Sequence, residues 1–199
     1  FQMQQQMVAG AKMKDFMEKE SRIPDSQDDT LQTETPHISI HDAGLSFESK
    51  TVLDGVSVDL PYGKKLGIVG GTGSGKSVLL KCLVRILDLD NGAITIDGHD
   101  IKDYSLKNLR NLFSFVFQDV FLFSNTIENN IKYADLSAAD EEMVNAAQMS
   151  HIRRYIERQP QKYKTFLKQA GANLSHGQRQ LMAIARAVLA DPKILILDD

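Results

Sequence analysis

Residues 70–77 read GGTGSGKS, and this stretch decides the fold. It fits the pattern G-x-x-x-x-G-K-[ST], in which glycines let the backbone curl so that successive N–H groups point at phosphate oxygens. The run KKLGIVG before it is expected to be a buried strand. Leucine and isoleucine recur every three or four residues after it, which predicts a helix. This order of elements predicts an α/β fold with a mainly parallel core.

The loop carries the first candidate binding site. Lys76 is expected to reach the β- and γ-phosphates of a nucleotide, and Ser77 to offer its hydroxyl to Mg²⁺. The positive end of the following helix dipole favours the same anion. The alternative is a glycine-rich turn with an exposed lysine. The predicted nucleotide-binding residues of the loop are Gly70, Gly71, Thr72, Gly73, Ser74, Gly75, Lys76, Ser77 and Val78.

A second candidate lies at the far end of the chain, where ILILDD reads as a buried strand followed by Asp198. A carboxylate that emerges at the C-terminal edge of a parallel strand is placed to hold a magnesium shell. Any strand can end in acidic residues, so the prediction depends on its pairing with the phosphate loop.

The remaining pattern outlines a helical start, a linker and further α/β elements. Residues 1–20 are rich in Met, Gln, Ala and Lys, which predicts a helix, with a frayed end as the alternative. Residues 21–36 are polar and acidic and read as a linker. We expect strands in HISI, LSF, VLDGVSVDL, AITI and FSFVF, and helices over residues 137–158 and 175–190.

Composition excludes several classes of protein. The 199 residues include 23 basic and 26 acidic side chains, a net charge of −3, with 42% apolar residues, as in an ordinary globular chain. The basic residues are scattered, so nucleic acid is not expected as a partner. Cys82 is the single cysteine and is expected to be a core residue. No apolar run approaches the ~20 residues of a membrane helix.

One further motif narrows the family. Residues 174–178 read LSHGQ, which resembles LSGGQ, the signature of the ATP-binding cassette family. Gln118 in FVFQDVFLF resembles the Q-loop of that family, and the runs TIENNIKYA and GQRQLMAIARAVLADPKILILDD resemble its exporter type. The resemblance covers residues 37–199. It implies a P-loop NTPase (RecA-like) parallel-sheet core with a small antiparallel β subdomain and a helical subdomain.

The resemblance also implies how the chain is organised and what it joins. Residues 1–36 are similar to the helix and linker that leave a membrane domain, and residues 37–199 to a nucleotide-binding domain. Two such domains, in a homodimer or heterodimer, are expected to close head to tail around ATP and Mg²⁺ at the cytoplasmic face of a membrane, driving a transmembrane domain. The nucleotide-binding domain is expected to be incomplete, because the D-loop and switch histidine of the family would follow Asp199.

Site roles follow from the same resemblance. Ser175, Gly177 and Gln178 are expected to contact the nucleotide of the opposite subunit, although S-x-x-Q is also the spacing of a capping box. Gln118 is expected to contact Mg²⁺ and water, with a polar residue at a strand end as the alternative. The implied catalytic residues are Asp199, Lys76 and Gln118, and the implied metal ligands are Ser77, Gln118 and Asp198.

Four positions depart from the family pattern. Asp199 replaces the usual Glu that positions water, and its side chain is shorter by one methylene, so we expect slow hydrolysis. Ser49 replaces the aromatic residue that usually stacks on adenine. His176 replaces a glycine of the signature, and TFLKQAG replaces a run that usually contacts membrane loops. Two hypotheses remain: an ATPase domain that powers export, or a hydrolysis-deficient module that binds ATP and dimerises.

Overall fold

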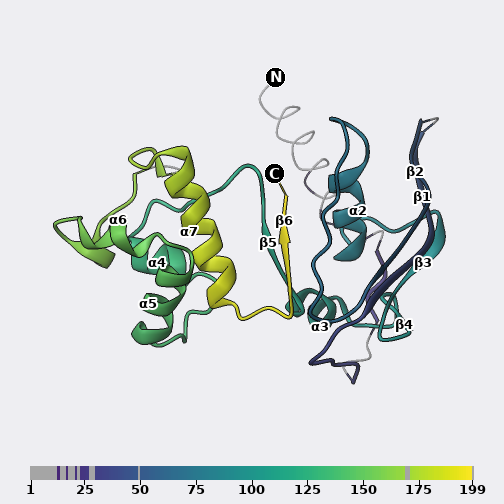
Figure 1. Ribbon diagram of the computed structural model, residues 1–199, viewed down its shortest axis with the longest axis horizontal. Helices are drawn as coiled ribbons and strands as arrows, with labels where there is room; N and C mark the ends of the chain where they lie inside the picture. Colours follow the sequence, from purple (N-terminus) through teal and green to yellow (C-terminus); the bar gives the residue numbers. More distant parts are fainter. Residues whose placement is uncertain are drawn as a thin grey trace.

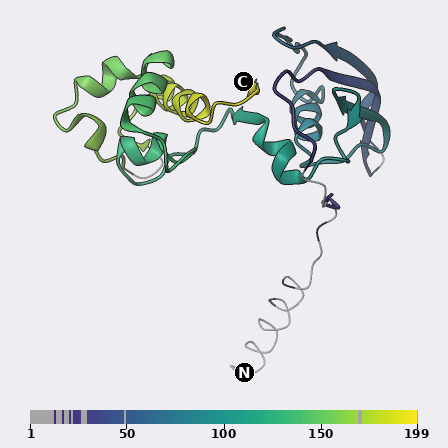
Figure 2. The same cartoon turned by 90° about the horizontal axis from the view of Figure 1, so that it is seen from below.

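The computed structural model describes residues 13, 17, 21, 23–26, 30–48, 50–168 and 171–198. Two parts flank a short parallel pair of strands, with a β-rich part on one side and a helical part on the other (Figures 1 and 2). The elements are β1 (Ile38–Phe47), β2 (Lys50–Leu60), α2 (Lys76–Leu83), β3 (Asn91–Ile96), β4 (His99–Asp100), α3 (Leu106–Asn111), β5 (Phe113–Val116), α4 (Ile127–Ile131), α5 (Asp140–Met149), α6 (Arg153–Glu157), the 3-10 helix η1 (Lys162–Lys164), α7 (His176–Leu189) and β6 (Ile194–Leu197).

The β-rich part is built on a four-stranded antiparallel sheet in the order β2-β1-β3-β4. Ile38 pairs with Leu60 of β2 on one side and with Ile96 of β3 on the other. Alternating residues of β1 and β3 point into a core that α2 and α3 complete, and Leu109 of α3 is fully buried in it. The expected antiparallel β subdomain is therefore confirmed.

The helical part has a core of its own. Met182 and Ala185 on the inner face of α7 pack against Ile127 and Ile131 of α4 and Met143 of α5, and all five are buried. These residues recur at helical spacing, which gives each helix one apolar stripe. The expected helical subdomain is confirmed, with one difference. The single helix expected over residues 137–158 is two helices, α5 and α6, because the chain turns at His151, where φ is 63°.

The parallel strands join the two parts. β5 pairs with β6 in parallel, with Phe113 opposite Ile194 and Val116 opposite Leu197. The strand expected in KKLGIVG is wrong: residues 64–70 form no ladder and are exposed, with Val69 97% accessible. A strand exists only where another strand accepts its hydrogen bonds, and β5 and β6 pair only with each other among the described strands. The expected burial of β6 holds only for Ile196.

The linker runs along the β-rich part. Arg85, which follows α2 with φ of 49°, is 1% exposed, and its Nη2 donates to the carbonyl of Pro24 at 2.9 Å. The backbone N–H of Leu106 donates to the carboxylate of Asp25 at 2.7 Å. Lys193 forms an ion pair with Glu34. The described part of the linker is thus fixed at the end of α2, the start of α3 and the start of β6.

Most of the expected N-terminal helix lies outside the described residues. Met13 and Met17 are described, and both are helical and exposed. Among the helices that the structure describes, none combines the length and the apolar character needed to cross a bilayer.

Candidate functional site

The glycine loop is curled around the Lys76 side chain. Gly75 is the N-cap of α2, and Lys76 is the first residue of the helix. The Lys76 ammonium donates to the carbonyls of Gly70 at 2.8 Å and Gly71 at 2.9 Å, and the N–H of Ser74 closes a turn onto Gly71. The first N–H groups of a helix have no intrahelical partner, so this end of α2 is suited to bind an anion.

Gly75 fixes the loop against the antiparallel sheet. Its φ is 91°, which side chains rarely adopt, and a Cβ on this residue would lie 2.7 Å from the carbonyl oxygen of Val52 in β2. Only glycine fits between a left-handed backbone and a neighbouring strand at that distance. The tip of the β1–β2 hairpin therefore lies beside the phosphate loop. Phe47, 45% exposed, is at that tip and pairs with Lys50.

The structure brings together the two residues predicted to hold Mg²⁺ that lie farthest apart in the sequence. The hydroxyl of Ser77 donates to a carboxylate oxygen of Asp198 at 2.9 Å. Among the residues described, no three His, Cys, Asp or Glu side chains cluster as a metal site. Magnesium does not require such a cluster, because it usually takes one or two protein oxygens and completes its shell with water and phosphate. The Ser77–Asp198 pair fits that ion.

Gln118 lies at the same edge of the parallel strands. Val116, the last residue of β5, accepts a hydrogen bond from the N–H of Asp198 at 3.0 Å, and Gln118 follows two residues later. Gln118 is exposed, and the described contacts include no hydrogen bond from it to Ser77 or Asp198. Gln118 therefore follows the strand that is bonded to Asp198, and its role at the Ser77–Asp198 pair stays a prediction.

The signature residues are on the other side of the molecule. Ser175 and Gln178 form a capping box at the start of α7: the Ser175 hydroxyl accepts from the N–H of Gln178 at 3.2 Å, and the Gln178 side chain accepts from the N–H of Ser175 at 2.9 Å. Gly177 is exposed, with open space around its Cα. Figures 1 and 2 show α7 and α2 on opposite sides of β5 and β6. The two sites are not brought together within one chain.

Three predicted positions lie outside the described residues: Asp199, Ser49 and Gln169. Their roles stay predictions. Lys168 is described and exposed, and its N–H donates to the Asn173 side chain at 3.1 Å.

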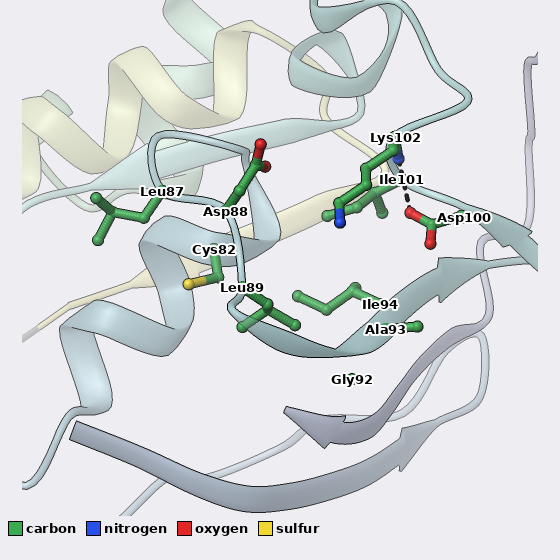
Figure 3. A pocket seen from close by; sticks show the side chains of 10 residues that line it. All are labelled: Cys82, Leu87, Asp88, Leu89, Gly92, Ala93, Ile94, Asp100, Ile101 and Lys102. Carbon is green, nitrogen blue, oxygen red and sulfur yellow. Dashed lines mark hydrogen bonds between the residues drawn. The ribbon is translucent and has the colours of Figure 1, made fainter. Parts of the chain in front are cut away.

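The cysteine is a core residue, as expected. Cys82 is 1% exposed, and Figure 3 shows it beside a small pocket between α2 and β3, whose other walls include Ile94 and Ile101. Burial raises the pKa of its thiol to about 11, and the nearby Asp88 and Asp90 charges add to the effect. A thiol that stays protonated is a poor nucleophile, which agrees with a structural role for Cys82.

Two residues that the sequence analysis did not single out connect elements of the helical part. Asn130 is fully buried, and its side chain bonds to both the N–H and the carbonyl of Phe123. Arg186 on α7 bonds to Asn130 and to the carbonyl of Phe121. The available signal was a charged residue between Ala185 and Ala187 on a helix with an apolar inner face.

Comparisons with known proteins agree with this geometry. The model of the ABC transporter family matches residues 53–199. The chain is 40% identical over 192 residues to "ABC transporter B family member 24, mitochondrial" of Arabidopsis thaliana, covering 92% of this chain and 28% of that protein. It is 44% identical over 162 residues to "ATP-dependent lipid A-core flippase" of Desulfotalea psychrophila, covering 81% of this chain and 28% of that protein.

Among solved structures, a bacterial Atm1-family ABC exporter with ATP bound superposes with a TM-score of 0.90 at 32% identity. The match covers 98% of this chain and 34% of the exporter. The chain thus spans about a third of these relatives or less. The match over nearly its whole length also confirms the predicted fold class. From its phosphate loop, its antiparallel and helical subdomains and these matches, the chain belongs to the ABC transporter family.

Proposed function

We propose that this chain binds ATP with Mg²⁺ at the phosphate loop and hydrolyses it as the nucleotide-binding domain of a membrane transporter. The observation that carries the proposal is the Ser77–Asp198 hydrogen bond of 2.9 Å beside the loop that curls around Lys76. It joins residues that are 121 positions apart in the sequence. The pairing supplies two hard oxygen donors next to an anion site, which is the combination that magnesium and a triphosphate require.

Lys76 and Ser77 of the loop, together with Asp198 and Gln118, then have separate roles in binding and hydrolysis. The Lys76 ammonium leaves the carbonyls of Gly70 and Gly71 and contacts phosphate oxygens, so the loop opens toward the ligand. Ser77 and Asp198 would hold Mg²⁺ with their side-chain oxygens, and the ion would neutralise charge that develops on the phosphates. Gln118, two residues after β5, would contact Mg²⁺ and water, and Asp199 would position the attacking water.

Phe47 is the proposed adenine contact. The residue is 45% exposed near the tip of the β1–β2 hairpin, and Val52 of the same hairpin lies against Gly75. Because Ser49 has no ring, stacking on the base falls to Phe47. Phe47→Ala is expected to weaken ATP binding if Phe47 stacks on the base, whereas Ser49→Tyr is expected to tighten it if position 49 is the stacking position.

The partner of the site is a second nucleotide-binding domain. Ser175, Gly177 and Gln178 lie across β5 and β6 from the loop of their own chain, so a head-to-tail copy supplies the capped helix end that closes over the nucleotide (Figure 1). Two of the relatives are named as a transporter and a flippase, which supports a transmembrane domain as the element moved by closure. The domain then lies at the cytoplasmic face of a membrane, with residues 1–36 as its connection.

A binding experiment tests the proposal. Titration of the full-length protein with ATP and Mg²⁺ in a calorimeter is expected to give one affinity for the wild type and a value at least about 10-fold weaker for Lys76→Ala, because a charged hydrogen bond contributes ~1.5–3 kcal/mol. Lys81→Ala is the matched control, since Lys81 is exposed on the same helix. Equal affinity of wild type and Lys76→Ala would refute the site.

A second candidate function is ATP-gated dimerisation without turnover, which the shorter Asp199 side chain favours. ATP turnover and ATP-dependent dimerisation of the full-length protein separate the two. Faster ATP turnover in Asp199→Glu than in wild type supports an ATPase whose rate is limited by the shorter side chain of Asp199. Dimers with no turnover in either protein support the regulatory module.

A further inference from the structure

Arg186 is bound in an unusual way for a charged residue. It is half-buried on α7, and among the described residues it has no carboxylate partner. Its Nε donates to the carbonyl of Asn130 at 2.9 Å, Nη2 to the Asn130 side chain at 3.1 Å and Nη1 to the carbonyl of Phe121 at 3.2 Å. Burial lowers its pKa. The positive charge is thus held by neutral oxygens. Burying a charge without an opposite charge costs free energy, and the hydrogen bonds offset part of that cost.

Two aromatic rings complete the surroundings of this guanidinium. Its central carbon lies 5.7 Å from the ring centre of Phe123 and 5.6 Å from that of Tyr133. These distances are typical of cation–π contacts, and the planar fork of arginine can stack and donate at the same time. Lysine has the charge but not the fork.

These contacts fasten one segment of backbone. Asn130 holds the N–H of Phe123 at 2.9 Å and its carbonyl at 3.0 Å, while Arg186 holds the carbonyl of Phe121. Upstream, Val116 is fixed by the N–H of Asp198 at 3.0 Å. Gln118 therefore lies in a stretch of four residues, 117–120, between an anchor on β6 and an anchor on α7.

A stretch this short has little freedom once both ends are fixed. If the Phe121 anchor is released, the next anchor is the contact of Asn130 with Phe123, so the stretch between anchors lengthens from residues 117–120 to residues 117–122 and Gln118 is held less tightly. A displacement of about 1 Å in a catalytic group can cost on the order of 100-fold in rate.

We propose that Arg186 is a positioning residue for Gln118: by holding the Phe121 carbonyl to α7, it sets where Gln118 stands relative to Ser77 and Asp198. This inference rests on the proposed ATPase function, in which Gln118 contacts Mg²⁺ and water. It adds a residue far from the phosphate loop to the set that controls the rate.

A kinetic experiment on the full-length protein tests the inference. Arg186→Lys is expected to lower kcat for ATP hydrolysis about 10- to 100-fold with the Kd for ATP changed less than about 3-fold, because the loop around Lys76 is untouched. Arg153→Lys is the matched control: Arg153 is a half-buried arginine of the helical part, paired with Glu157. This control is expected to leave both values unchanged.

A double-mutant cycle separates positioning from a purely structural role. If Arg186 acts through Gln118, then Arg186→Lys with Gln118→Ala is no slower than Gln118→Ala alone. Additive losses, or a fall in Tm with kcat preserved, would overturn the inference. Tyr133→Leu is a second variant, since Tyr133 is exposed and its loss removes one ring only. Tyr133→Leu is expected to lower kcat less than Arg186→Lys does. Combined with Gln118→Ala, it is expected to be no slower than Gln118→Ala alone.

Amide hydrogen exchange gives a readout that does not depend on turnover. Residues 117–123 are expected to exchange faster in Arg186→Lys than in wild type, while residues of α2 exchange at the same rate. Unchanged exchange over residues 117–123 would refute the anchor even if the protein proves not to hydrolyse ATP. Absent turnover with faster exchange refutes the proposed function and leaves the anchor standing.

Discussion

Replacing Gly75 by alanine is expected to destabilise the chain far more than the same change elsewhere in the phosphate loop. The substitution combines two costs. Gly75 has a φ of 91°, and the new Cβ would stand 2.7 Å from the Val52 carbonyl, with two more atoms of β2 within 3.2 Å. The nearest neighbour is backbone, so it cannot turn away as a flexible side chain would.

The two costs have separate magnitudes. A left-handed backbone costs a residue with a Cβ roughly 1–2 kcal/mol. Forcing an extra methyl into a packed site costs about 1–3 kcal/mol. Together Gly75→Ala is expected to lower the free energy of unfolding by about 2–5 kcal/mol, a large share of the roughly 5–15 kcal/mol that holds a domain folded.

The same loop provides two controls. Gly73 has a φ of 77° and open space around it, so Gly73→Ala isolates the backbone cost of roughly 1–2 kcal/mol. Gly71 has neither a positive φ nor a neighbour within 4 Å, so Gly71→Ala is expected to change stability by less than about 0.5 kcal/mol. The free energies of unfolding of the three variants are measured by urea unfolding. Far-ultraviolet circular dichroism is the signal, because the chain has no tryptophan whose fluorescence could be followed.

The order of the three variants decides the outcome. The reasoning is supported if Gly71→Ala is the most stable variant, Gly73→Ala the next and Gly75→Ala the least stable. If Gly73→Ala and Gly75→Ala are equally stable, the loop is not packed on β2 as described, and if Gly71→Ala is as unstable as either, backbone conformation is not the cause.

Three further predictions concern the cores and a helix cap. Leu109→Ala is expected to cost about 2–5 kcal/mol in urea unfolding because Leu109 is fully buried, whereas Leu136→Ala, at a residue 82% exposed, should cost less than about 0.5 kcal/mol; equal losses would contradict the core assignment. Ser175→Ala removes the capping box of α7 and is expected to cost about 1 kcal/mol by the same measurement; an unchanged midpoint would count against the cap. The pKa of Cys82 is about 11 in the folded chain and ~8.5 in an unfolded one. The protonated thiol therefore makes its full contribution to the free energy of unfolding below about pH 8.5, and this contribution is lost as pH rises through about 11. Between these pH values the free energy of unfolding should fall more steeply in wild type than in Cys82→Ala. Parallel plots of this free energy against pH would refute the raised pKa.

The phosphate loop was predictable because its information is local. Glycines at fixed spacing, a lysine and a helix-forming run lie within 20 residues, and the structure shows the loop, α2 and the capping box of α7 where the sequence places them. The pairing of Ser77 with Asp198 was expected from the two motifs together.

The failures concern non-local structure. The run in residues 64–70 has the apolar pattern of a strand but no partner among the described strands, and a strand is defined by its partner. The break between α5 and α6 depends on one residue, His151, in a left-handed conformation that its own sequence does not demand. Arg186 was missed because its partners lie more than 50 residues away in the chain.

The buried arginine after α2 has a mechanical consequence. Tension applied along the chain from its N-terminal side meets the Pro24–Arg85 and Asp25–Leu106 contacts before it meets β1. The force would enter at the C-terminal end of α2, which begins at Lys76, and at the start of α3. A pull on the residues before Pro24 is therefore expected to reach the C-terminal end of α2 and the start of α3 before it reaches the sheet.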